Sequence, residues 1–486
     1  MPEPTAHGLT SKYQLMPERH PIFSRKFFLA GKGLSFRTSK YFGEAMLVGV
    51  VTGFVVVAFR YLIEFAHKYL MDGIGGHGRL SFLESGQLFS GIFSLEKLAD
   101  PGRYVMIVLP ALGALAGYLL IKRFSSVEHA RGTDSAIRAY HHRDGYITGT
   151  VIPVKSVASV LTVGAGGSAG YEGPVTLLGA AVGSVISRKL NLSVRARRIL
   201  MAAGLSAGIA ALFQSPLAGA LFGFEVFYSS SDVEYETLLP CFIASALSYT
   251  IFAYFFGWGA LMEMPVGCAY DSGIRLLPYF VLALAVTFGS RFYIHFFRKA
   301  EMRFATMRLK RWMKVALGGL LTGVFGFFFP DILGPGYSII RSAFALCTEM
   351  SDFDTAVLAI GFLALFFIKA MTTSFTVGSG GSGGLFAPAL VCGGALGASV
   401  GLFFDLLLPS SVGINPAAFA LVGMAGFIAS SIRVPLTAIV MVAEISGNHN
   451  LLLPAMWVCG ISFWLNNGWS LYRSQVHCRE SSPVHE

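Results

Sequence analysis

The chain has 486 residues, of which 54% are hydrophobic and 13% are charged, and its mean hydropathy is +0.62. This composition excludes a soluble globular protein of this length and predicts an all-α, polytopic membrane protein. The net charge of +10 would suit a nucleic-acid partner, but Lys and Arg lie at the edges of apolar runs. Orientation in the membrane explains this charge more simply, so no nucleic-acid partner is expected.

The chain order predicts five regions. Residues 1–40 form a basic arm with seven Lys or Arg against two Glu, so the N-terminus is expected in the cytoplasm. No cleavable signal sequence is found. A first transmembrane repeat is predicted at 41–256, a linker at 257–274 and a second repeat at 275–472. The tail at 473–486 is expected to be cytoplasmic, and it is too short for an appended regulatory domain.

Many of the apolar runs are shorter than the ~20 residues that a perpendicular helical span needs. Short, tilted helices are therefore expected, and the 56 glycines allow close packing and interrupted helices. The stretch from Gly204 to Tyr228 is predicted to form two short helices that break near Pro216. The six cysteines are dispersed, without CxxC or Cys/His metal spacing, so packing thiols are the simpler interpretation, and no metal or cofactor is expected.

A duplication organises the sequence. The segment Gly164–Val185, GAGGSAGYEGPVTLLGAAVGSV, returns 214 residues later, with Gly170 and Pro174 opposite Gly384 and Pro388. A second pair of segments, Gly204–Glu225 and Gly423–Glu444, matches at an offset of 219. Two matches in the same order predict two structurally similar halves.

The first glycine-rich segment is predicted to begin a helix inside the membrane. Basic clusters lie on both sides of it, which places both of its ends on the cytoplasmic side. A helix from Glu172 to Val185 would rise about 20 Å, short of a hydrocarbon core of about 30 Å. A helix N-terminus presents unpaired N–H groups, and glycines let the backbone approach a small ion closely. The two copies together therefore predict an anion site.

The glutamate in this segment has no acidic counterpart, since Glu172 falls opposite Phe386. An ionised Glu172 can compete with an anion for the site and withdraw when protonated, which would link proton movement to anion movement. A carboxylate that only caps its helix is the alternative. No GxxxxGK[ST], HExxH or GxSxG motif occurs, and no second acid lies close to Glu172. An intramembrane enzyme is therefore disfavoured.

The pentapeptides GYEGP (Gly170–Pro174) and GLFAP (Gly384–Pro388), with PLAGALFGFE, SIRVPLTAIVMVAE and SLYRSQ, resemble the CLC family of chloride channels and chloride/proton antiporters. The resemblance extends from about Glu44 to Tyr472. It implies two inverted-topology repeats of tilted, discontinuous helices, a homodimer, and a multi-pass protein of a prokaryotic plasma (inner) membrane with both termini cytoplasmic.

The resemblance also implies roles for individual residues. Glu172 matches the external gating glutamate, and Leu385 and Phe386 match residues whose backbone N–H groups hold the central anion. Tyr472 matches a tyrosine whose hydroxyl donates to that anion, the alternative being an interfacial tyrosine. Lys155 matches a lysine near the pathway, although it could simply be an interfacial basic residue.

The sequence departs from the family pattern at the first anion-binding loop. GTDSA (Gly132–Ala136) stands where GSGIP is typical, so Thr133 replaces a chloride-binding serine and can still donate one hydrogen bond. Asp134 adds a negative charge, and we expect it to turn away as a helix N-cap because an unpaired acid would weaken anion binding.

Two further departures concern the proton route and the entrance. Glu225 matches the more structural of two adjacent acids, whereas Val226 stands where a proton-transfer glutamate would be. Tyr171 replaces a basic residue and makes the entrance less positive by one charge.

The sequence favours a chloride/proton antiporter in a lipid bilayer, with chloride and protons as its transported partners. A passive voltage- or pH-gated chloride channel is the alternative, because Val226 cannot carry a proton. A fluoride exporter or an intramembrane enzyme is less favoured.

Overall fold

The computed structural model describes residues 41–74, 101–124, 132–259, 261–262, 276–345, 355–409 and 413–485. The predicted arm at 1–40 and most of the predicted linker lie outside these residues. In the first half the α-helices are α2 (Phe42–Ala66), α5 (Pro101–Arg123), α6 (Thr133–His142), α7 (Val151–Gly164), α8 (Glu172–Lys189), α9 (Val194–Phe213), α10 (Pro216–Glu225) and α11 (Leu238–Phe256).

In the second half they are α12 (Leu276–Thr306), α13 (Arg311–Phe328), α14 (Tyr337–Ala345), α15 (Thr355–Gly378), α16 (Phe386–Leu407), α17 (Pro416–Ser431), α18 (Pro435–Ser446) and α19 (Leu452–Leu465). A π-helix, η2 (His67–Ile74), extends α2. The short 3₁₀ helices are η4 (Tyr235–Thr237), η6 (Pro330–Ile332), η8 (His449–Leu451) and η9 (Arg479–Ser481).

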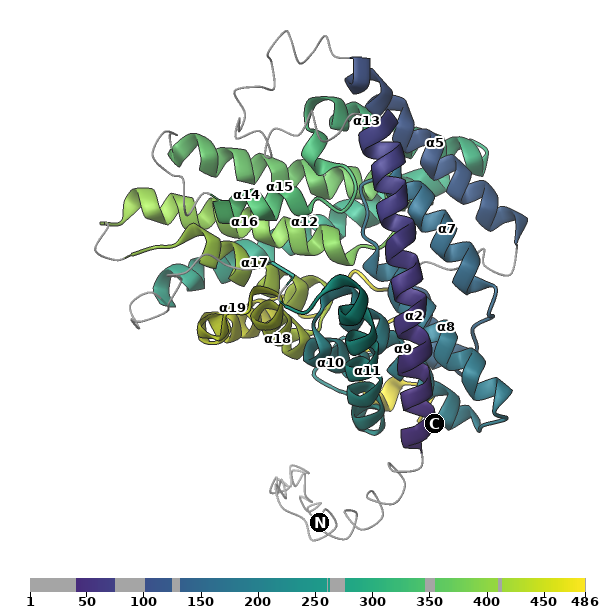
Figure 1. Ribbon diagram of the computed structural model, residues 1–486. Coiled ribbons are helices and arrows are strands. Elements are labelled where there is room, and N and C mark those ends of the chain that lie inside the picture. The colour runs from purple at the N-terminus through teal and green to yellow at the C-terminus, as the bar shows by residue number, and fades with distance from the viewer. Residues whose placement is uncertain are drawn as a thin grey trace, which may run out of the picture. The chain divides into compact units, whose positions relative to one another are not determined.

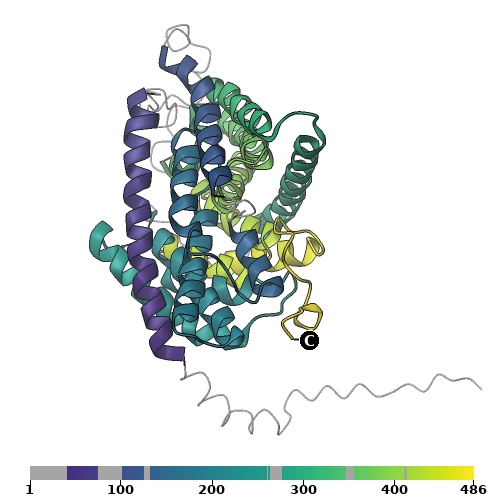
Figure 2. The same ribbon diagram turned by 90° about the vertical axis from the view of Figure 1, so that its right-hand side faces the viewer.

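Helix lengths agree with the expected mixture of long and short spans. Seven described helical segments are long and apolar enough to cross a membrane, and they contain α2, α5, α9, α11, α12, α15 and α16. Shorter apolar helices include α7, α17 and α18. Figure 1 shows α2 as one long purple helix beside α8 and α9, and the turned view of Figure 2 shows it standing at the edge of the bundle.

The duplicated segments fold into matching pairs of helices. α8 packs against α9, and α16 packs against α17. A Cβ placed on Gly179 would lie 2.0 Å from the Gly204 carbonyl oxygen, and one on Gly393 would lie 2.5 Å from the Gly423 carbonyl oxygen. Glycine therefore permits the same close helix crossing in both halves, as small residues do in membrane helix pairs.

The predicted break near Pro216 is confirmed. α9 ends at Phe213, Gln214 has a left-handed φ of 53°, and α10 starts at Pro216. The start of α9 differs from the prediction, because the helix begins at Val194 and contains most of the basic cluster that was expected to precede it. The Ser193 side chain accepts a hydrogen bond from the Ala196 N–H and caps this helix.

Each half supplies a glutamate that accepts hydrogen bonds from the start of a helix in the other half. Glu225, at the end of α10, accepts hydrogen bonds from the backbone N–H groups of Leu436 and Thr437 at the start of α18. Glu444, in α18, accepts from the N–H groups of Leu217 and Ala218 at the start of α10. Because both acids fill the unpaired donors of the opposite helix, they join the two halves.

Candidate anion site

The two glycine-rich loops meet at one pair of hydrogen bonds. The Gly170 N–H donates to the Gly384 carbonyl at 2.9 Å, and the Gly384 N–H donates to the Gly170 carbonyl at 2.8 Å. These two residues are equivalent at the repeat offset of 214. The pseudo-twofold relation between the halves therefore passes through this bridge, directly before α8 and α16.

Three helix N-termini converge beside the bridge. α8 begins at Glu172, α16 begins at Phe386 and α6 begins at Thr133. A Cβ on Gly132, whose φ is +68°, would lie 2.9 Å from the carbonyl carbon of Gly173, so the starts of α6 and α8 are in close contact. Each N-terminus contributes partial positive charge and N–H donors, which favours an anion at their meeting point.

Glu172 places its carboxylate at this meeting point. Its side chain is buried, with 1% of its surface exposed. Oε1 accepts a hydrogen bond from the Tyr337 hydroxyl at 2.5 Å, and Oε2 accepts from the Ala387 N–H at 3.3 Å. The carboxylate of the first repeat thus binds the helix N-terminus of the second, as an anion would.

Tyr337 and Lys369 are parts of this site that the sequence did not reveal. Tyr337 lies 165 residues from Glu172 and belongs to no motif considered. Lys369 is fully buried, and its Nζ donates to the carbonyls of Ile332 and Gly334 at 2.7 Å each. The repeat carried a usable signal, because Lys369 stands 214 residues after Lys155.

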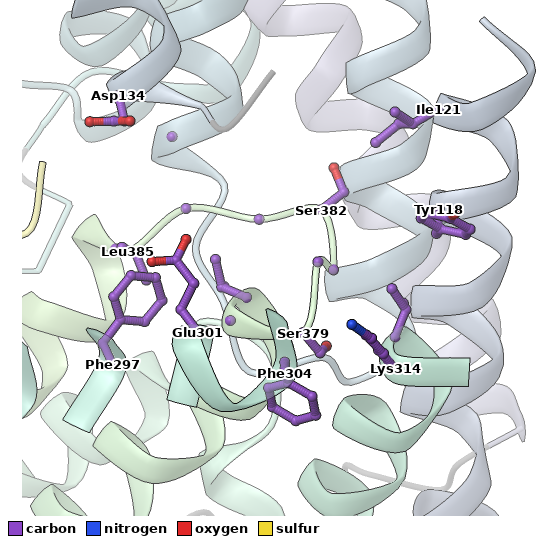
Figure 3. Close-up of a pocket in the computed structure, with 18 of the residues that line it drawn as sticks. Tyr118, Ile121, Asp134, Phe297, Glu301, Phe304, Lys314, Ser379, Ser382 and Leu385 are labelled. Carbon is purple, nitrogen blue, oxygen red and sulfur yellow. The ribbon is translucent and has the colours of Figure 1, made fainter. Parts of the chain in front are cut away.

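A cavity of about 500 Å³ opens beside the bridge, and Gly384 is among its lining residues. Four predicted site residues, Thr133, Lys155, Leu385 and Tyr472, line it, together with Gly173. Figure 3 shows the loop of Ser379, Ser382 and Leu385 running along this cavity. Glu172 and Phe386 are not among the lining residues, but each adjoins one, so the cavity reaches the starts of α8 and α16.

Basic side chains outnumber acids around the cavity. Among the described lining residues the acids are Asp134 and Glu301, and the basic residues are Lys122, Lys155, Arg311, Lys314 and Arg473. Glu301 forms an ion pair with Arg473 at 2.8 Å, and Figure 3 shows its side chain among those that line the cavity. The remaining excess of positive charge favours anion entry.

Two residues that line the cavity, Thr133 and Tyr472, carry hydroxyl groups. Tyr472 is buried, its oxygen lies within reach of the Thr133 hydroxyl, and its own proton has no well-aligned acceptor among the described residues. The Thr133 hydroxyl is paired with the Thr176 hydroxyl at 2.7 Å, and Thr176 also contacts the Gly173 carbonyl at 2.7 Å. Because a buried hydroxyl without a partner is costly, Tyr472 has a donor available for a ligand in the cavity.

Phe386 is held differently from these polar residues. Its ring is buried and packs against Phe213 and Phe222, with centroids 5.4 and 5.6 Å apart. Leu385 is the N-cap of α16. The backbone N–H groups at the start of α16 are therefore fixed by a ring anchored in the first half.

Asp134 is not the predicted N-cap. Gly132 occupies that position without a side-chain hydrogen bond, and Asp134 lies in the first turn of α6. Its two carboxylate oxygens accept from the Ser474 N–H at 2.9 Å and the Ser474 hydroxyl at 3.1 Å. These donors from the segment after Tyr472 hold the carboxylate, which replaces the capping explanation.

Glu225 has the structural role that was expected, since its side chain accepts hydrogen bonds from the start of α18, including one from the Thr437 hydroxyl at 2.8 Å. Val226 is fully buried, and its carbonyl accepts from the Gln475 side chain at 2.9 Å. Residue 226 therefore offers no titratable side chain at the position where the family pattern has a proton-transfer glutamate.

The family model described as "Voltage gated chloride channel" matches residues 112–467. The chain belongs to this family. Among curated relatives of the family, a ClcB-like chloride channel protein of Ralstonia nicotianae is 31% identical over 360 residues, covering 73% of this chain and 81% of the relative. The H(+)/Cl(-) exchange transporter ClcA of Yersinia pestis is 32% identical over 429 residues, covering 85% and 82%.

Solved structures of the family share the fold. A CLC-type fluoride/proton antiporter has a TM-score of 0.70 at 19% identity, covering 94% of this chain and 100% of that chain. A slow cyanobacterial Cl⁻/H⁺ antiporter has a TM-score of 0.70 at 21% identity, covering 88% and 95%. The expected CLC fold of two inverted-topology repeats is thus confirmed, and the chain is a multi-pass integral membrane protein.

Proposed function

We propose that this protein exchanges chloride for protons across the membrane, with Glu172 as both gate and proton carrier. The observation that carries the proposal is the buried Glu172 carboxylate at three converging helix N-termini, bound to the N–H of Ala387. An ionised carboxylate there occupies the anion position, and a protonated one gains less from the positive helix ends. Protonation therefore favours its withdrawal and opens the path to chloride.

Chloride reaches this position through the basic cavity. Thr133 and Tyr472 supply hydroxyl donors, and Leu385 and Phe386 supply backbone N–H groups at the start of α16. Lys155 is buried, lines the cavity and adds positive charge without occupying the anion position. The alternative interfacial roles of Lys155 and Tyr472 fit less well, because both side chains are buried at the cavity.

Protons can reach Glu172 through the same cavity, which extends to Gly173. A polar cavity of this size holds water, and water can relay a proton without a carboxylate at position 226. The relatives named as H(+)/Cl(-) exchange transporters support exchange. The proposal includes a homodimer in a prokaryotic inner membrane with both termini cytoplasmic, and no enzymatic step.

A passive chloride channel is the second candidate. It is favoured by Val226, which leaves the inner end of the proton route without a titratable side chain. The two candidates differ in whether a chloride gradient can drive protons uphill.

The test is reconstitution of the full-length protein in liposomes, with chloride and proton fluxes followed together. We expect a chloride gradient to drive protons against their own gradient. We expect Glu172→Gln to abolish proton movement and to preserve chloride flux, because the amide cannot carry a proton. Chloride flux without proton movement at any pH in the wild type would support the channel, and normal proton transport by Glu172→Gln would exclude Glu172 as the carrier.

A further inference from the structure

We propose that Tyr337 is a positioning residue that holds the ionised Glu172 carboxylate in the anion path, and that this hydrogen bond sets the pH at which the path opens. The inference rests on the proposed gating role of Glu172. Tyr337 is the first residue of α14 and donates to Glu172 Oε1 at 2.5 Å, while the opposite oxygen accepts from Ala387 N–H at 3.3 Å. The hydrogen bond from the Tyr337 hydroxyl is thus shorter than the one from the Ala387 N–H.

A buried lysine that donates to two backbone carbonyls fixes the position of Tyr337. Lys369 of α15 donates its Nζ protons to the carbonyls of Ile332 and Gly334, in the turn that leads into α14. A Cβ on Gly336 would lie 2.9 Å from Lys369 Nζ, and Gly336 has a φ of +84°. Glycine is needed for this close approach, and the turn then directs Tyr337 at Glu172.

A similar helix start occurs at Thr133. Thr133 follows Gly132, which also has a positive φ, and begins the short helix α6. Lys155 on α7 and Lys369 on α15 are equivalent at the repeat offset of 214. Thr133 and Tyr337 are separated by 204 residues and not by 214. Each nevertheless begins the helix that precedes the lysine-bearing helix, α6 before α7 and α14 before α15, so they hold equivalent places in the order of helices. Thr133 lines the cavity, and the Tyr337 hydroxyl binds the carboxylate that stands in for an anion.

The charged and titratable neighbours of Glu172 come from several helices. Tyr337, Tyr171, Tyr472 and Lys369 interact electrostatically with Glu172, and Arg60 of α2 interacts with Tyr171 and Tyr337. Of these side chains, Tyr337 donates a hydrogen bond to the carboxylate. Removal of its hydroxyl leaves the charges of Lys369 and Arg60 unchanged, so the effect of the hydrogen bond can be isolated.

A hydroxyl that donates to a carboxylate stabilises the ionised form more than the protonated form. Loss of the Tyr337 hydroxyl therefore makes protonation and withdrawal of Glu172 easier. A hydrogen bond to a charged group changes such an equilibrium about tenfold, which corresponds to a shift of about one pH unit. The opening of the path should move to higher pH by this amount.

The experiment measures chloride flux in liposomes from pH 4 to pH 8 for Tyr337→Phe in the full-length protein. We expect the midpoint of pH activation to rise by about one unit, with the flux at low pH unchanged. The matched control is Tyr293→Phe. Tyr293 is fully buried in α12, and its hydroxyl has no hydrogen-bond partner among the described residues, so its removal should leave the midpoint unchanged.

A double-variant cycle separates this inference from the gating proposal. Adding Tyr337→Phe to Glu172→Gln should change nothing further, because the charged acceptor is absent. An unshifted midpoint in Tyr337→Phe, or an equal shift in Tyr293→Phe, would overturn the inference alone. Wild-type pH dependence in Glu172→Gln would instead overturn the gating role, and this inference with it.

Discussion

Thr133 is the site residue whose chemistry differs most visibly from the family pattern. Its hydroxyl contacts Thr176, and its helix begins against Gly173, next to the proposed gate Glu172. The additional methyl group of threonine is accommodated because the side chain is buried against α8, with 2% of its surface exposed. The replacement keeps a hydroxyl at this position, and an anion would accept its proton in place of the Thr176 oxygen.

Replacement of Thr133 by Ala should weaken chloride binding. The loss of one hydroxyl donor to a charged ligand costs about 1.5 to 3 kcal/mol, or roughly ten- to a hundredfold in affinity. Calorimetric titration of the purified protein with chloride measures this change. An unchanged affinity in Thr133→Ala would remove Thr133 from the site, and Thr133→Ser, which keeps the hydroxyl, should retain most of the affinity.

Asp134 shows why single residues were harder to place than motifs. The sequence placed an acid near the site, and its position at the start of a helix led to the prediction that it caps that helix. Its partner is Ser474, 340 residues later, whose N–H and hydroxyl bind both carboxylate oxygens. The contact of Tyr337 with the site could not be predicted from the sequence for the same reason, since its partner Glu172 lies in the other repeat.

At the scale of helices, the glycine crossings repeat with the sequence. Gly179 and Gly204 face each other between α8 and α9, and Gly393 and Gly423 do so between α16 and α17. Sequence periodicity predicted these segments as duplicates, and the structure confirms that each pair packs backbone against backbone. The helix ends were less predictable, because caps such as Ser193 decide where α9 begins.

Replacement of Gly179 by Ala should destabilise the protein, because its Cβ would lie 2.0 Å from the Gly204 carbonyl oxygen. Overpacking of this kind costs about 1 to 3 kcal/mol. Thermal unfolding in detergent, followed by the loss of the monodisperse gel-filtration peak, measures the change.

Gly460→Ala in α19 is the matched control, because a Cβ there meets nothing within 4 Å. Alanine is the better helix former by up to about 1 kcal/mol. The control should therefore be neutral or slightly stabilising. Equal stability of the Gly179 and Gly460 variants would contradict the close crossing.

At the scale of the whole molecule, the C-terminal segment closes on the first half. The N–H groups of Ser229 and Ser230 donate to the carbonyls of Val476 and His477. His141, at the end of α6, contacts the Ser482 hydroxyl at 2.8 Å and the Phe227 carbonyl at 3.0 Å. This docking fixes the segment that follows Tyr472.

Docking of this segment should weaken in acid. Burial lowers the pKa of His141 from 6.5 to about 4, so the docked form disfavours the charged ring. The stabilisation is fully present above pH 6.5 and is lost as the pH falls toward 4, amounting to roughly 2 kcal/mol between pH 6.5 and 5. Hydrogen exchange of the C-terminal segment, corrected for intrinsic exchange rates, should show less protection at pH 5 than at pH 7.5.

His141→Gln serves as the reference for this measurement, because glutamine does not titrate. Protection of the segment in this variant should depend much less on pH. A pH dependence equal to that of the wild type would assign the effect to other groups, such as the His485–Glu234 pair.

The bridge between Gly170 and Gly384 bears on how a carrier with two similar halves can move. Its two hydrogen bonds join equivalent residues, and the caps of Glu225 and Glu444 tie the same halves again. A rocking motion that separated the halves at the anion site would break these buried contacts together, each costing a desolvated donor and acceptor. The backbone frame is therefore expected to stay stationary, and under the proposed gating role access to the two sides of the membrane would change through rotation of the Glu172 side chain alone.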